Sequence, residues 1–500
     1  MRRLTLLAGL LMLGMLTGLP LASAAPRTDT TALEQAVTAD AIFAHLEALQ
    51  EIADENDGTR AAGTPGYDAS VDYVVAQLEA AGYDPVVQTF EFPYFEVLSP
   101  GVLERLSPLP ETYSPETDFL TAEYSGSGDV TALLQATNDI VIPPGAEAST
   151  SNSGCEDADF AGFVEGNIAL IQRGTCTFAE KVANAIEAGA SAVMIFNEGQ
   201  EGRQEAFNGT LGSPVEIPVV FTSFAVGEEL YNLLKTGSVS MHVATSTFFE
   251  IREASNVIAE LEGTRDDRTV VVGAHLDSVI EGPGINDNGS GSGMILEIAV
   301  QMAELGITPT NTVRFIWFGA EEAGLLGSEY YVSQLSKREL KDIAVMLNFD
   351  MVASPNYVRF VYDGDAGPNG SGNVEDVFLD YFAAAGLPVE PTAFDGRSDY
   401  GPFIDAGIPA GGLFTGAEDI KTAGEAEIYG GFAGIAYDPC YHQACDTIEN
   451  VDLEVLEQMA DAAAHATLTF AMTLSSVNGT AKASDKAKAH GLYKGSHVQR

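Results

Sequence analysis

Apolar residues in the first part of the chain follow two different spacings. Between residues 38 and 81 they recur every three or four positions, which predicts two helices, at 38–55 and 67–81. Residues 86–95 instead alternate between apolar and polar side chains, which is typical of a strand with one buried face. We therefore expect two helices followed by a strand.

From residue 253 to residue 475, short apolar runs alternate with stretches of helical spacing. The runs predict strands at 256–261, 270–274, 312–318, 343–349, 358–362 and 411–414. The stretches between them predict helices at 294–305, 325–335, 372–385 and 452–474. Strands that alternate with helices are typical of an α/β fold with a doubly wound, mostly parallel sheet, and this is the fold class that we expect.

The segment 125–249 interrupts this pattern with a smaller one. Strands are expected at 168–172, 192–197, 217–222 and 239–245, and a helix at 178–188 separates the first two. The larger pattern is present on both sides of this segment. We therefore interpret 125–249 as a small α/β domain inserted into a main domain that is formed by 38–124 and 250–475.

The two ends of the chain differ from these domains. Arg2 and Arg3, an apolar run at 4–16 and the sequence Ala-Ser-Ala at 22–24 predict a secretory signal peptide, residues 1–24, that is cleaved after Ala24. Residues 25–37 are polar, and we expect them to be disordered. Residues 476–500 are predicted to form a flexible basic tail. No other stretch is long and apolar enough to cross a membrane, so we expect an exported, extracellular protein.

Charge and cysteine content narrow the classes of function. The chain has 72 acidic and 24 basic residues, giving a net charge of −48, which disfavours binding to nucleic acids and to anionic membranes. An even number of cysteines in an exported protein predicts disulfides. Three pairings are possible, and proximity in the sequence favours Cys155 with Cys176 and Cys440 with Cys445.

Candidate chemistry begins in the stretch 269–293. A short apolar run predicts a strand, and the loop after it contains His275, Asp277 and Asp287. The carboxyl ends of strands are where open α/β sheets hold their ligands. His275 and Asp287 are donors of the kind that bind metals, and Asp277 is close enough in sequence to accept the other ring N–H of His275. This pattern is also common by chance, so the other acidic residues and histidines determine whether it indicates a metal site.

Some further donors follow two other predicted strands, and one more lies between two cysteines. Glu321 and Glu322 come shortly after the strand at 312–318, Asp350 directly follows the strand at 343–349, and His442 lies between Cys440 and Cys445. The donor set is therefore His275, Asp287, Glu322, Asp350 and His442.

The number of donors indicates how many metal ions they can bind. One catalytic zinc ion takes three protein ligands and a water molecule. Two ions that share one bridging carboxylate need five ligands, and Asp287 can be the bridge. Two such ions can activate a shared water molecule, and Glu321 remains available as the general base.

Seven short stretches follow one another in a recognisable order. They are GTRAAGTPGYDASVDYV, AHLDSVIEGPGINDNGSGSG, FGAEEAGLLGSEYYV, LNFDMV, GRSDYGPF, GGLFTGAED and DPCYHQACD. Over residues 38–98 and 252–475 the chain closely resembles the secreted bacterial double-zinc aminopeptidases of metallopeptidase family twenty-eight, of the aminopeptidase S/Y type. The insert, with GNIALIQRGTCTFAEKVANAIEAGASAVMIFN, resembles a protease-associated domain. The resemblance implies a zinc exopeptidase fold with a protease-associated insert.

The resemblance also implies roles for individual residues in the metal centre. One zinc ion would be held by His275 and Asp350, the other by Glu322 and His442, with Asp287 bridging the two ions. Asp277 would support His275, and the Asp287–Asn288 peptide bond would be cis. Some relatives also bind calcium, but not all the ligands of that site can be matched in this sequence.

Catalytic and substrate-binding roles follow from the same resemblance. Glu321 would take a proton from the attacking water and pass it to the leaving amine, and Tyr441 would donate a hydrogen bond to the oxyanion. Arg397 and Phe414 match residues beside the substrate. Glu321 and Asp350 are the candidates to receive the free α-ammonium group.

We therefore expect a monomeric zinc aminopeptidase that removes large apolar, leucine-like residues from the N-termini of peptides. One alternative is a glutamate-type zinc carboxypeptidase of the same fold, which would need several arginines and a helical dimerisation domain. Another is a non-catalytic, receptor-like binding protein, a class that typically loses zinc ligands. A serine hydrolase is disfavoured because Ser290 and Ser292 lack the G-x-S-x-G frame.

Overall fold

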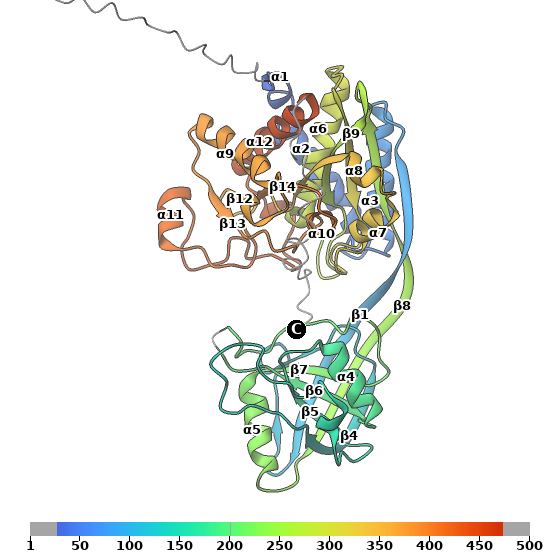
Figure 1. The fold of residues 1–500 in the computed structure, drawn as a ribbon, viewed down its shortest axis with the longest axis vertical. Coiled ribbons are helices and arrows are strands. Elements are labelled where there is room, and N and C mark those ends of the chain that lie inside the picture. Colours follow the sequence, from blue (N-terminus) through green and yellow to red (C-terminus); the bar gives the residue numbers. More distant parts are fainter. Residues whose placement is uncertain (1–27, 201, 474–500) are drawn as a thin grey trace, which may run out of the picture.

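The computed structural model describes residues 28–200 and 202–473, and it forms two lobes (Figure 1). The main domain is joined to the insert by the two long strands β1 (Val86–Ser107) and β8 (Ser240–Leu261). The predicted signal peptide, residues 1–24, and the predicted basic tail, residues 476–500, lie outside the described residues.

The main domain is built on one twisted sheet. Its strands lie in the order β13 (Glu390–Thr392), β12 (Phe360–Tyr362), β14 (Ala410–Phe414), β11 (Ile343–Phe349), β9 (Arg265–His275), β10 (Asn311–Phe318), β8 and β1. The central strands β14, β11, β9 and β10 are parallel, whereas β12 is antiparallel to β14 and β8 is antiparallel to β10. The prediction of an α/β fold with a mostly parallel sheet is confirmed.

Helices cover both faces of this sheet. One layer contains α1 (Thr31–Glu34), α2 (Ala39–Glu55), α3 (Pro65–Ala80), α6 (Gly291–Glu304), α9 (Ser371–Ala385) and α12 (Leu453–Met472). The other contains α7 (Leu326–Gln334), α8 (Glu339–Asp342) and α10 (Tyr400–Asp405). Successive strand residues enter opposite layers, since Val270 and Val272 pack in the first core and Val271 packs in the second. Residues 269–275 of β9 are therefore all buried, which explains the unbroken apolar run in this part of the strand.

The strands β1 and β8 form a continuous antiparallel ribbon that runs through both lobes (Figure 1). Each is 22 residues long, whereas the sequence predicts only the pieces at 86–95, 239–245 and 256–261. The middle of the ribbon, around Phe248 and Ile251, is exposed to solvent between the lobes. A strand with no buried face has no alternation of apolar and polar residues, so the pattern could not predict this part.

The strands of the insert continue the same sheet beyond the ribbon, because β4 pairs antiparallel with β8. Strands β4 (Gly128–Ala136), β5 (Ile168–Gln172), β6 (Ala192–Phe196) and β7 (Val219–Thr222) are parallel, and β3 (Phe119–Thr121) pairs antiparallel with β7 at the edge. Helices α4 (Phe178–Glu187) and α5 (Phe224–Leu234) cover its two faces, and the two-residue strand β2 (Glu111–Thr112) pairs with β1.

The predicted start of the insert at residue 125 is wrong. Leu103, Tyr113 and Phe119 are buried in the core of the insert, so the chain enters this lobe along β1, well before residue 125. The segment between β1 and β4 has short strands and turns without a clear apolar period. Its position depends on the length of the ribbon, which the sequence pattern does not reveal.

The prediction that residues 25–37 are disordered is also wrong for the part that the structure describes. Thr31–Glu34 forms the short helix α1, which packs against α12, and Leu33 and Val37 are fully buried. A single helical turn with two apolar residues is too short to give a periodic signal. Its order comes from the tertiary contact with α12, which lies more than 400 residues away in the sequence.

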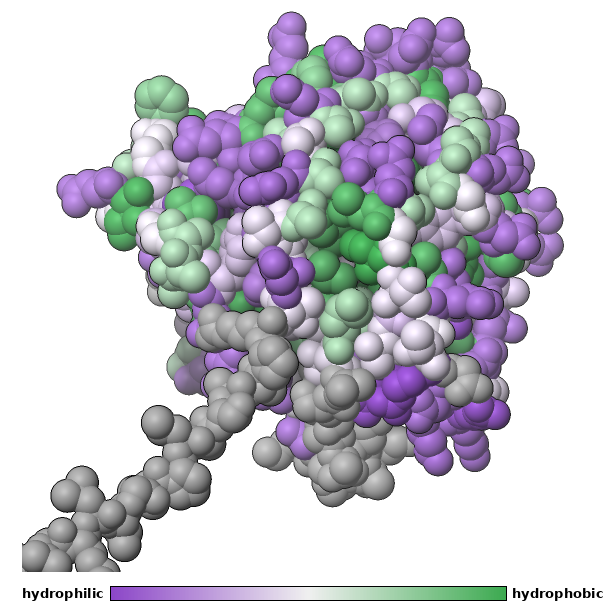
Figure 2. All heavy atoms as spheres, turned by 90° about the horizontal axis from the view of Figure 1, so that it is seen from above, coloured by the Kyte–Doolittle hydropathy of each residue, from purple (hydrophilic) through white to green (hydrophobic). Residues whose placement is uncertain are grey.

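Helix α11 (Ala423–Tyr429) belongs to neither helix layer and lies on an arm that projects from the main domain (Figure 1). The end of the main domain opposite the insert is mostly hydrophilic around an area of apolar residues (Figure 2). No helix among the described residues has the length and apolar character needed to cross a bilayer.

Candidate metal centre and active site

The candidate donors meet at the carboxyl edge of the parallel strands. His275 is the last residue of β9, Glu321 and Glu322 follow β10, and Asp350 directly follows β11. Neighbouring parallel strands end at the same edge of a sheet, so these three segments necessarily come together. Asp287 enters from the segment Ile285–Ser290, which leads into α6. Its peptide bond to Asn288 is cis, as the resemblance implies.

Asp287 lies between the two histidines. Its Oδ1 is 3.2 Å from Nε2 of His275, and its Oδ2 is 3.3 Å from Nε2 of His442. On the first side, Nε2 of His275 also lies 3.3 Å from Oδ1 of Asp350. On the second side, Nε2 of His442 lies 3.1 Å from Oε2 of Glu322. The five predicted donors therefore form two halves with one carboxylate in the middle.

The potential ligand atoms form two groups, and within each group all atoms lie within 4.8 Å of one another. One comprises His275, Glu321 and Asp350, and the other comprises His275, Asp287 and Glu322. Imidazole nitrogens and carboxylate oxygens are the donors that zinc takes in catalytic sites. Oε1 of Glu322 is buried and has no hydrogen-bond partner among the described residues, which leaves an acceptor for a cation. The residues present therefore fit a zinc centre.

The buried carboxylates of the cluster give it a negative potential that favours binding of a cation. Burial raises the pKa of Glu321 well above its ordinary value, and Glu322 and Asp350 add to this while His275 opposes it. Burial also raises the pKa of Glu322 to about 7, against the opposing effect of His442. Buried carboxylates at such close range are costly unless cations compensate them.

The two histidines and Asp287 respond to this negative charge. Burial alone would lower the pKa of His442, but Glu322 and Asp287 outweigh burial and raise it to about 11. Burial would raise the pKa of Asp287, but hydrogen bonds from His275 and His442 hold it below its ordinary range. These shifts have one cause, the concentration of buried carboxylates, which attracts positive charge to the cluster.

Asp277 supports the site in a different way from the one predicted. Its carboxylate Oδ1 is 3.7 Å from Nδ1 of His275, too far for a hydrogen bond, and the ring N–H instead faces the backbone oxygen of Asp277 at 3.1 Å. The Asp277 carboxylate accepts the backbone N–H groups of Glu321 and Glu322 at 3.2 and 3.3 Å. The main chain of Asp277 orients His275, and its side chain fixes the segment that carries both glutamates.

Arg60 is a structural residue of the site that we did not predict. It is fully buried, and its guanidinium donates hydrogen bonds to the backbone oxygens of Leu276, Pro283 and Gly284 at 2.5 to 2.8 Å. These oxygens belong to the loop between His275 and Asp287. Burial lowers the pKa of Arg60 to about 10, and Asp277 and Asp446 oppose this effect. Arg60 therefore holds the loop and adds a positive charge beneath the carboxylates.

The predicted substrate residues are Tyr441, Arg397 and Phe414, and Tyr441 and Arg397 lie close enough to each other to interact electrostatically. The ring of Tyr441 stacks on that of His442, with centroids 3.8 Å apart, and burial raises the pKa of Tyr441 well above its ordinary value. Arg397 has a half-exposed side chain that forms an ion pair with Glu418 at 3.0 Å. Phe414, at the end of β14, stacks on Phe360 with centroids 5.9 Å apart.

Both disulfides pair as proximity in the sequence predicts, Cys155 with Cys176 and Cys440 with Cys445. The second closes a loop of six residues around Tyr441 and His442. His442 has a φ angle of 55°, in the left-handed region that residues other than glycine rarely adopt. The disulfide therefore restricts the residue that completes the second half of the metal centre.

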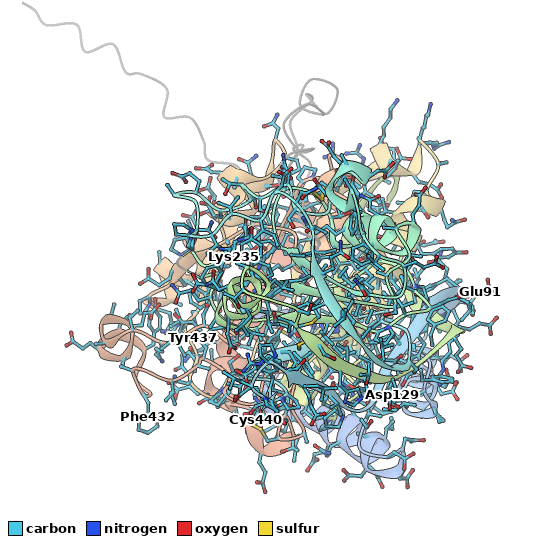
Figure 3. The ribbon with its side chains drawn as sticks, turned by 90° about the horizontal axis from the view of Figure 1, so that it is seen from below. Glu91, Asp129, Lys235, Phe432, Tyr437 and Cys440 are labelled. Carbon is cyan, nitrogen blue, oxygen red and sulfur yellow. A yellow bond between two sulfur atoms is a disulfide. The ribbon has the colours of Figure 1, made fainter. Side chains whose placement is uncertain are left out.

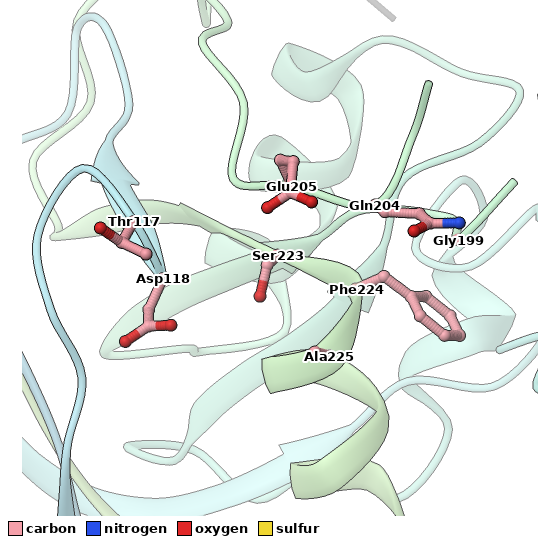
Figure 4. Close-up of a pocket in the computed structure, with 8 residues that line it drawn as sticks. All are labelled: Thr117, Asp118, Gly199, Gln204, Glu205, Ser223, Phe224 and Ala225. Carbon is pink, nitrogen blue, oxygen red and sulfur yellow. The ribbon is translucent and has the colours of Figure 1, made fainter. Parts of the chain in front are cut away.

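A separate cavity of about 400 Å³ lies in the insert (Figure 4). Its lining includes Asp118, Glu205, Ser223 and Phe224, and it contains none of the candidate donors. Among the described residues, both donor groups belong to the main domain. The chemistry therefore lies at the sheet edge and not in this cavity.

An open α/β sheet with imidazole and carboxylate donors at its strand ends defines a metal-dependent hydrolase. Comparisons with known proteins narrow this class. Residues 256–467 match peptidase family M28, and residues 136–230 match the PA domain. An aminopeptidase of Pseudomonas aeruginosa is 45% identical over 470 residues, which cover 92% of this chain and 86% of that protein.

Two solved structures are similar over most of the chain. An aminopeptidase from Aneurinibacillus has a TM-score of 0.72 and 28% identity, covering 90% of this chain and 98% of that one. A zinc aminopeptidase from Bacillus subtilis has a TM-score of 0.61 and 28% identity, covering 88% and 97%. The chain belongs to peptidase family M28 and is a metallo-aminopeptidase with a PA domain, as its motifs indicate. Its family implies zinc as the metal and peptides as substrates.

Proposed function

We propose that this protein is an exported aminopeptidase that uses two zinc ions to remove large apolar residues from the N-termini of peptides. The observation that carries the proposal is the position of Asp287, whose two carboxylate oxygens face two different histidines at 3.2 and 3.3 Å. His275 with Asp350, and His442 with Glu322, would hold the two ions, and Asp287 would bridge them. Zinc bound there would supply Lewis-acid activation of a water molecule, whose pKa such sites bring to about 7.

The chain's own groups would then move the protons and hold the substrate. Glu321 belongs to the cluster but is left over from the five proposed ligands, so it would take a proton from the attacking water and return it to the leaving amine. Tyr441, stacked on His442, would donate a hydrogen bond from its hydroxyl group to the developing oxyanion. The free α-ammonium group would be received by Glu321 and Asp350, which are close to one another beside His275.

The preference for a leucine-like residue rests on the side of the cluster near Asp350. Ser398, next to Arg397, donates a hydrogen bond to Asp350 at 2.7 Å, and Thr415, next to Phe414, bonds to the backbone of Met351. Phe414 would form an apolar wall for the first side chain. A pocket of this type discriminates between apolar side chains by only about 1–3 kcal/mol per methylene, so the specificity would be broad.

The test is hydrolysis of Leu-p-nitroanilide and of its N-acetylated form, before and after chelation and the return of zinc. We expect cleavage of only the free-amine substrate, loss of activity with the chelator, and recovery with zinc. Equal cleavage of both substrates would contradict recognition of the α-ammonium group. Metal analysis of the same protein would give two zinc ions per chain if the proposed centre is correct, and it would also measure any bound calcium.

Export and oligomeric state are part of the same proposal. Residues 1–24 would direct export and be removed after Ala24, and the mature chain would act as a monomer. The N-terminal sequence and the solution mass of protein recovered from the culture medium test both statements.

A further inference from the structure

The disulfide of the insert, between Cys155 and Cys176, lies beside a buried lysine. Lys181 belongs to α4, the helix that begins two residues after Cys176, and its side chain is fully buried. Its ammonium group donates a hydrogen bond to the backbone oxygen of Ser153 at 2.5 Å. The same nitrogen lies 3.5 Å from Sγ of Cys155. A buried positive charge therefore contacts one of the two bonded sulfur atoms.

The carboxylates that act on Lys181 are Glu198, Asp159 and Glu180, and each has another environment of its own. Glu198 forms an ion pair with Arg203 at 2.6 Å. Asp159 accepts a backbone N–H at 3.1 Å, and Glu180 is exposed to solvent. Among the described residues, the ammonium group contacts a backbone oxygen and a disulfide sulfur, neither of which carries a charge. A buried ammonium group without an anionic partner is costly, so the oxidised insert leaves this charge poorly compensated.

Reduction of the disulfide would supply the missing anion. A thiol beside a lysine has a lowered pKa and loses its proton readily. The Cys155 thiolate would then be the anionic partner that Lys181 lacks in the oxidised protein. Stabilisation of the reduced form makes a disulfide a stronger oxidant. We therefore expect this disulfide to be reduced more easily than it would be without Lys181.

The disulfide is accessible to a small molecule. Both cysteines are half-buried, and the neighbouring residues Asn152 and Thr175 are exposed. The hydroxyl group of Thr175 lies 3.5 Å from Sγ of Cys155, so a second polar group is available to a thiolate there. A low-molecular-weight thiol can thus approach from solvent while Lys181 contacts the sulfur from the protein interior.

The second disulfide has the opposite electrostatic environment. The carboxylate of Asp438 accepts the backbone N–H of Cys440 at 2.8 Å, and Asp446 directly follows Cys445. Both aspartates are buried. Negative charge nearby disfavours a thiolate, so reduction gains no comparable stabilisation at this site. The Cys440–Cys445 disulfide therefore serves as an internal comparison.

We propose that the Cys155–Cys176 disulfide is a reversible thiol–disulfide exchange site for low-molecular-weight thiols, with Lys181 stabilising the Cys155 thiolate. The thiolate of the incoming molecule attacks Sγ of Cys176 and forms a mixed disulfide there. The bond between the two cysteines breaks, and Cys155 leaves as a thiolate beside Lys181. This site goes beyond the proposed aminopeptidase function and does not depend on it.

The exchange is balanced by a second small thiol. Its thiolate attacks the mixed disulfide and releases Cys176 as a thiol, together with one low-molecular-weight disulfide. Two electrons thus pass from two small thiols to the protein disulfide. Attack of the Cys155 thiolate on the mixed disulfide instead reverses the first step and restores the cross-link.

The experiment equilibrates the full chain at pH 7.5 in glutathione buffers of graded redox ratio, traps thiols by alkylation, and measures the reduced fraction of each disulfide by peptide mass spectrometry. In Lys181→Met, the equilibrium constant for reduction of Cys155–Cys176 should fall by about four- to ten-fold, as expected when a thiol loses a neighbouring cation. This change corresponds to about 18–30 mV in reduction potential. The equilibrium constant of Cys440–Cys445 should stay the same in this variant.

The matched control is Lys235→Met, which removes the same charge from an exposed position in the insert (Figure 3). Its equilibrium constant for reduction of Cys155–Cys176 should equal that of the unmodified protein. An equal fall in Lys235→Met and Lys181→Met would overturn the inference, because the effect would then come from the net charge of the chain. Equal constants in all three proteins would overturn it as well.

A second measurement needs no variant. In the reduced, unmodified protein, the pH dependence of the alkylation rate at Cys155 gives the pKa of its thiol. We expect a pKa below the ordinary value of about 8.5, since a neighbouring ammonium group favours the thiolate. A pKa at or above about 8.5 would overturn the inference. None of these results depends on hydrolysis of Leu-p-nitroanilide, so the proposed function is tested separately.

Discussion

Asp446 accepts the backbone N–H of Asp287 through its Oδ2, at 3.0 Å. Its Oδ1 accepts the backbone N–H of Asn286 at 2.9 Å. Asp446 directly follows Cys445, so these bonds connect the disulfide loop that carries His442 with the segment that carries the proposed bridging carboxylate. The two halves of the metal centre are thus fixed relative to each other by a carboxylate that is not itself among the candidate donors.

Replacement of Asp446 with Asn should weaken zinc binding. The amide group of Asn would direct an N–H at one of the two backbone N–H groups that the carboxylate now satisfies, so Asp287 would shift. Loss of such an outer partner typically costs about 10- to 100-fold in metal affinity. Competition with a chelator, followed by measurement of bound zinc, checks this expectation. Asp376→Asn, at an exposed position on α9, is the control and should leave zinc affinity unchanged.

Replacement of Glu321 with Gln should abolish most catalysis and preserve metal binding. Glutamine keeps the size of the side chain but cannot take a proton from water, so kcat should fall by about 10²- to 10⁴-fold. Zinc content should remain equal to that of the unmodified protein, since Glu321 is not one of the five proposed ligands. Retention of more than a tenth of the activity would assign the general base to another group. Glu304→Gln, at the exposed end of α6, provides the comparison.

The two disulfides should have separable effects. Closing a loop restricts the unfolded chain more when the loop is longer, so Cys155→Ser with Cys176→Ser should cost about 3 kcal/mol in free energy of unfolding, and Cys440→Ser with Cys445→Ser about 2 kcal/mol. Only the second pair holds His442, so only its loss should reduce zinc affinity and kcat. Denaturant unfolding and zinc titration of both double variants measure the two effects independently.

Equal losses of activity in the two double variants would contradict this separation. They would mean that the insert, where Cys155 and Cys176 lie, controls the active site as strongly as the loop around His442 does.

The candidate metal donors could be found from the sequence because residues beside them in the chain give a recognisable signal. His275 ends a strand and Asp350 directly follows one, the apolar runs of both strands are easily recognised, and parallel strands bring their ends together. Asp446 and Arg60 do not lie at the end of a recognisable apolar strand. The partners of Arg60 are backbone oxygens more than 210 residues away, so no local spacing predicts them, even though Arg60 lies in one of the recognised stretches.

The same distinction explains which parts of the fold could be predicted. Strand β11, which is buried on both faces, has the predicted bounds, because burial dictates its composition. The ribbon of β1 and β8 and the helix α1 could not be predicted, because exposure in the first case and a single tertiary contact in the second leave no periodic pattern. The orientation of the Asp277 carboxylate was mispredicted for a related reason, since sequence proximity to His275 does not determine which backbone groups the side chain reaches.

Lys181 lies in α4 of the insert and is fully buried. Its ammonium group donates to the backbone oxygen of Ser153 at 2.5 Å and lies 3.5 Å from the sulfur of Cys155. Burial lowers the pKa of Lys181 from 10.5 to about 8, although Glu198 and Asp159 oppose the shift. In the unfolded chain the same group keeps its ordinary pKa. Between pH 8 and pH 10.5, therefore, the unfolded state binds more protons than the folded state.

Burial of Lys181 makes the free energy of unfolding depend on pH. Stability rises with pH wherever the unfolded state binds more protons, so the penalty for burying charged Lys181 is complete below pH 8 and is relieved between about pH 8 and pH 10.5. Relative to a Lys181→Met variant, the unmodified protein should gain up to about 1.4 kcal/mol in free energy of unfolding per pH unit over this range. Denaturant unfolding of both proteins at pH 6, 7, 8, 9 and 10 measures the difference. The control is Lys235→Met, which alters an exposed lysine of the same domain (Figure 3), and its difference in free energy of unfolding from the unmodified protein should be the same at every pH. If the difference for Lys181→Met is also the same at every pH, Lys181 stays charged in the folded insert at all these pH values.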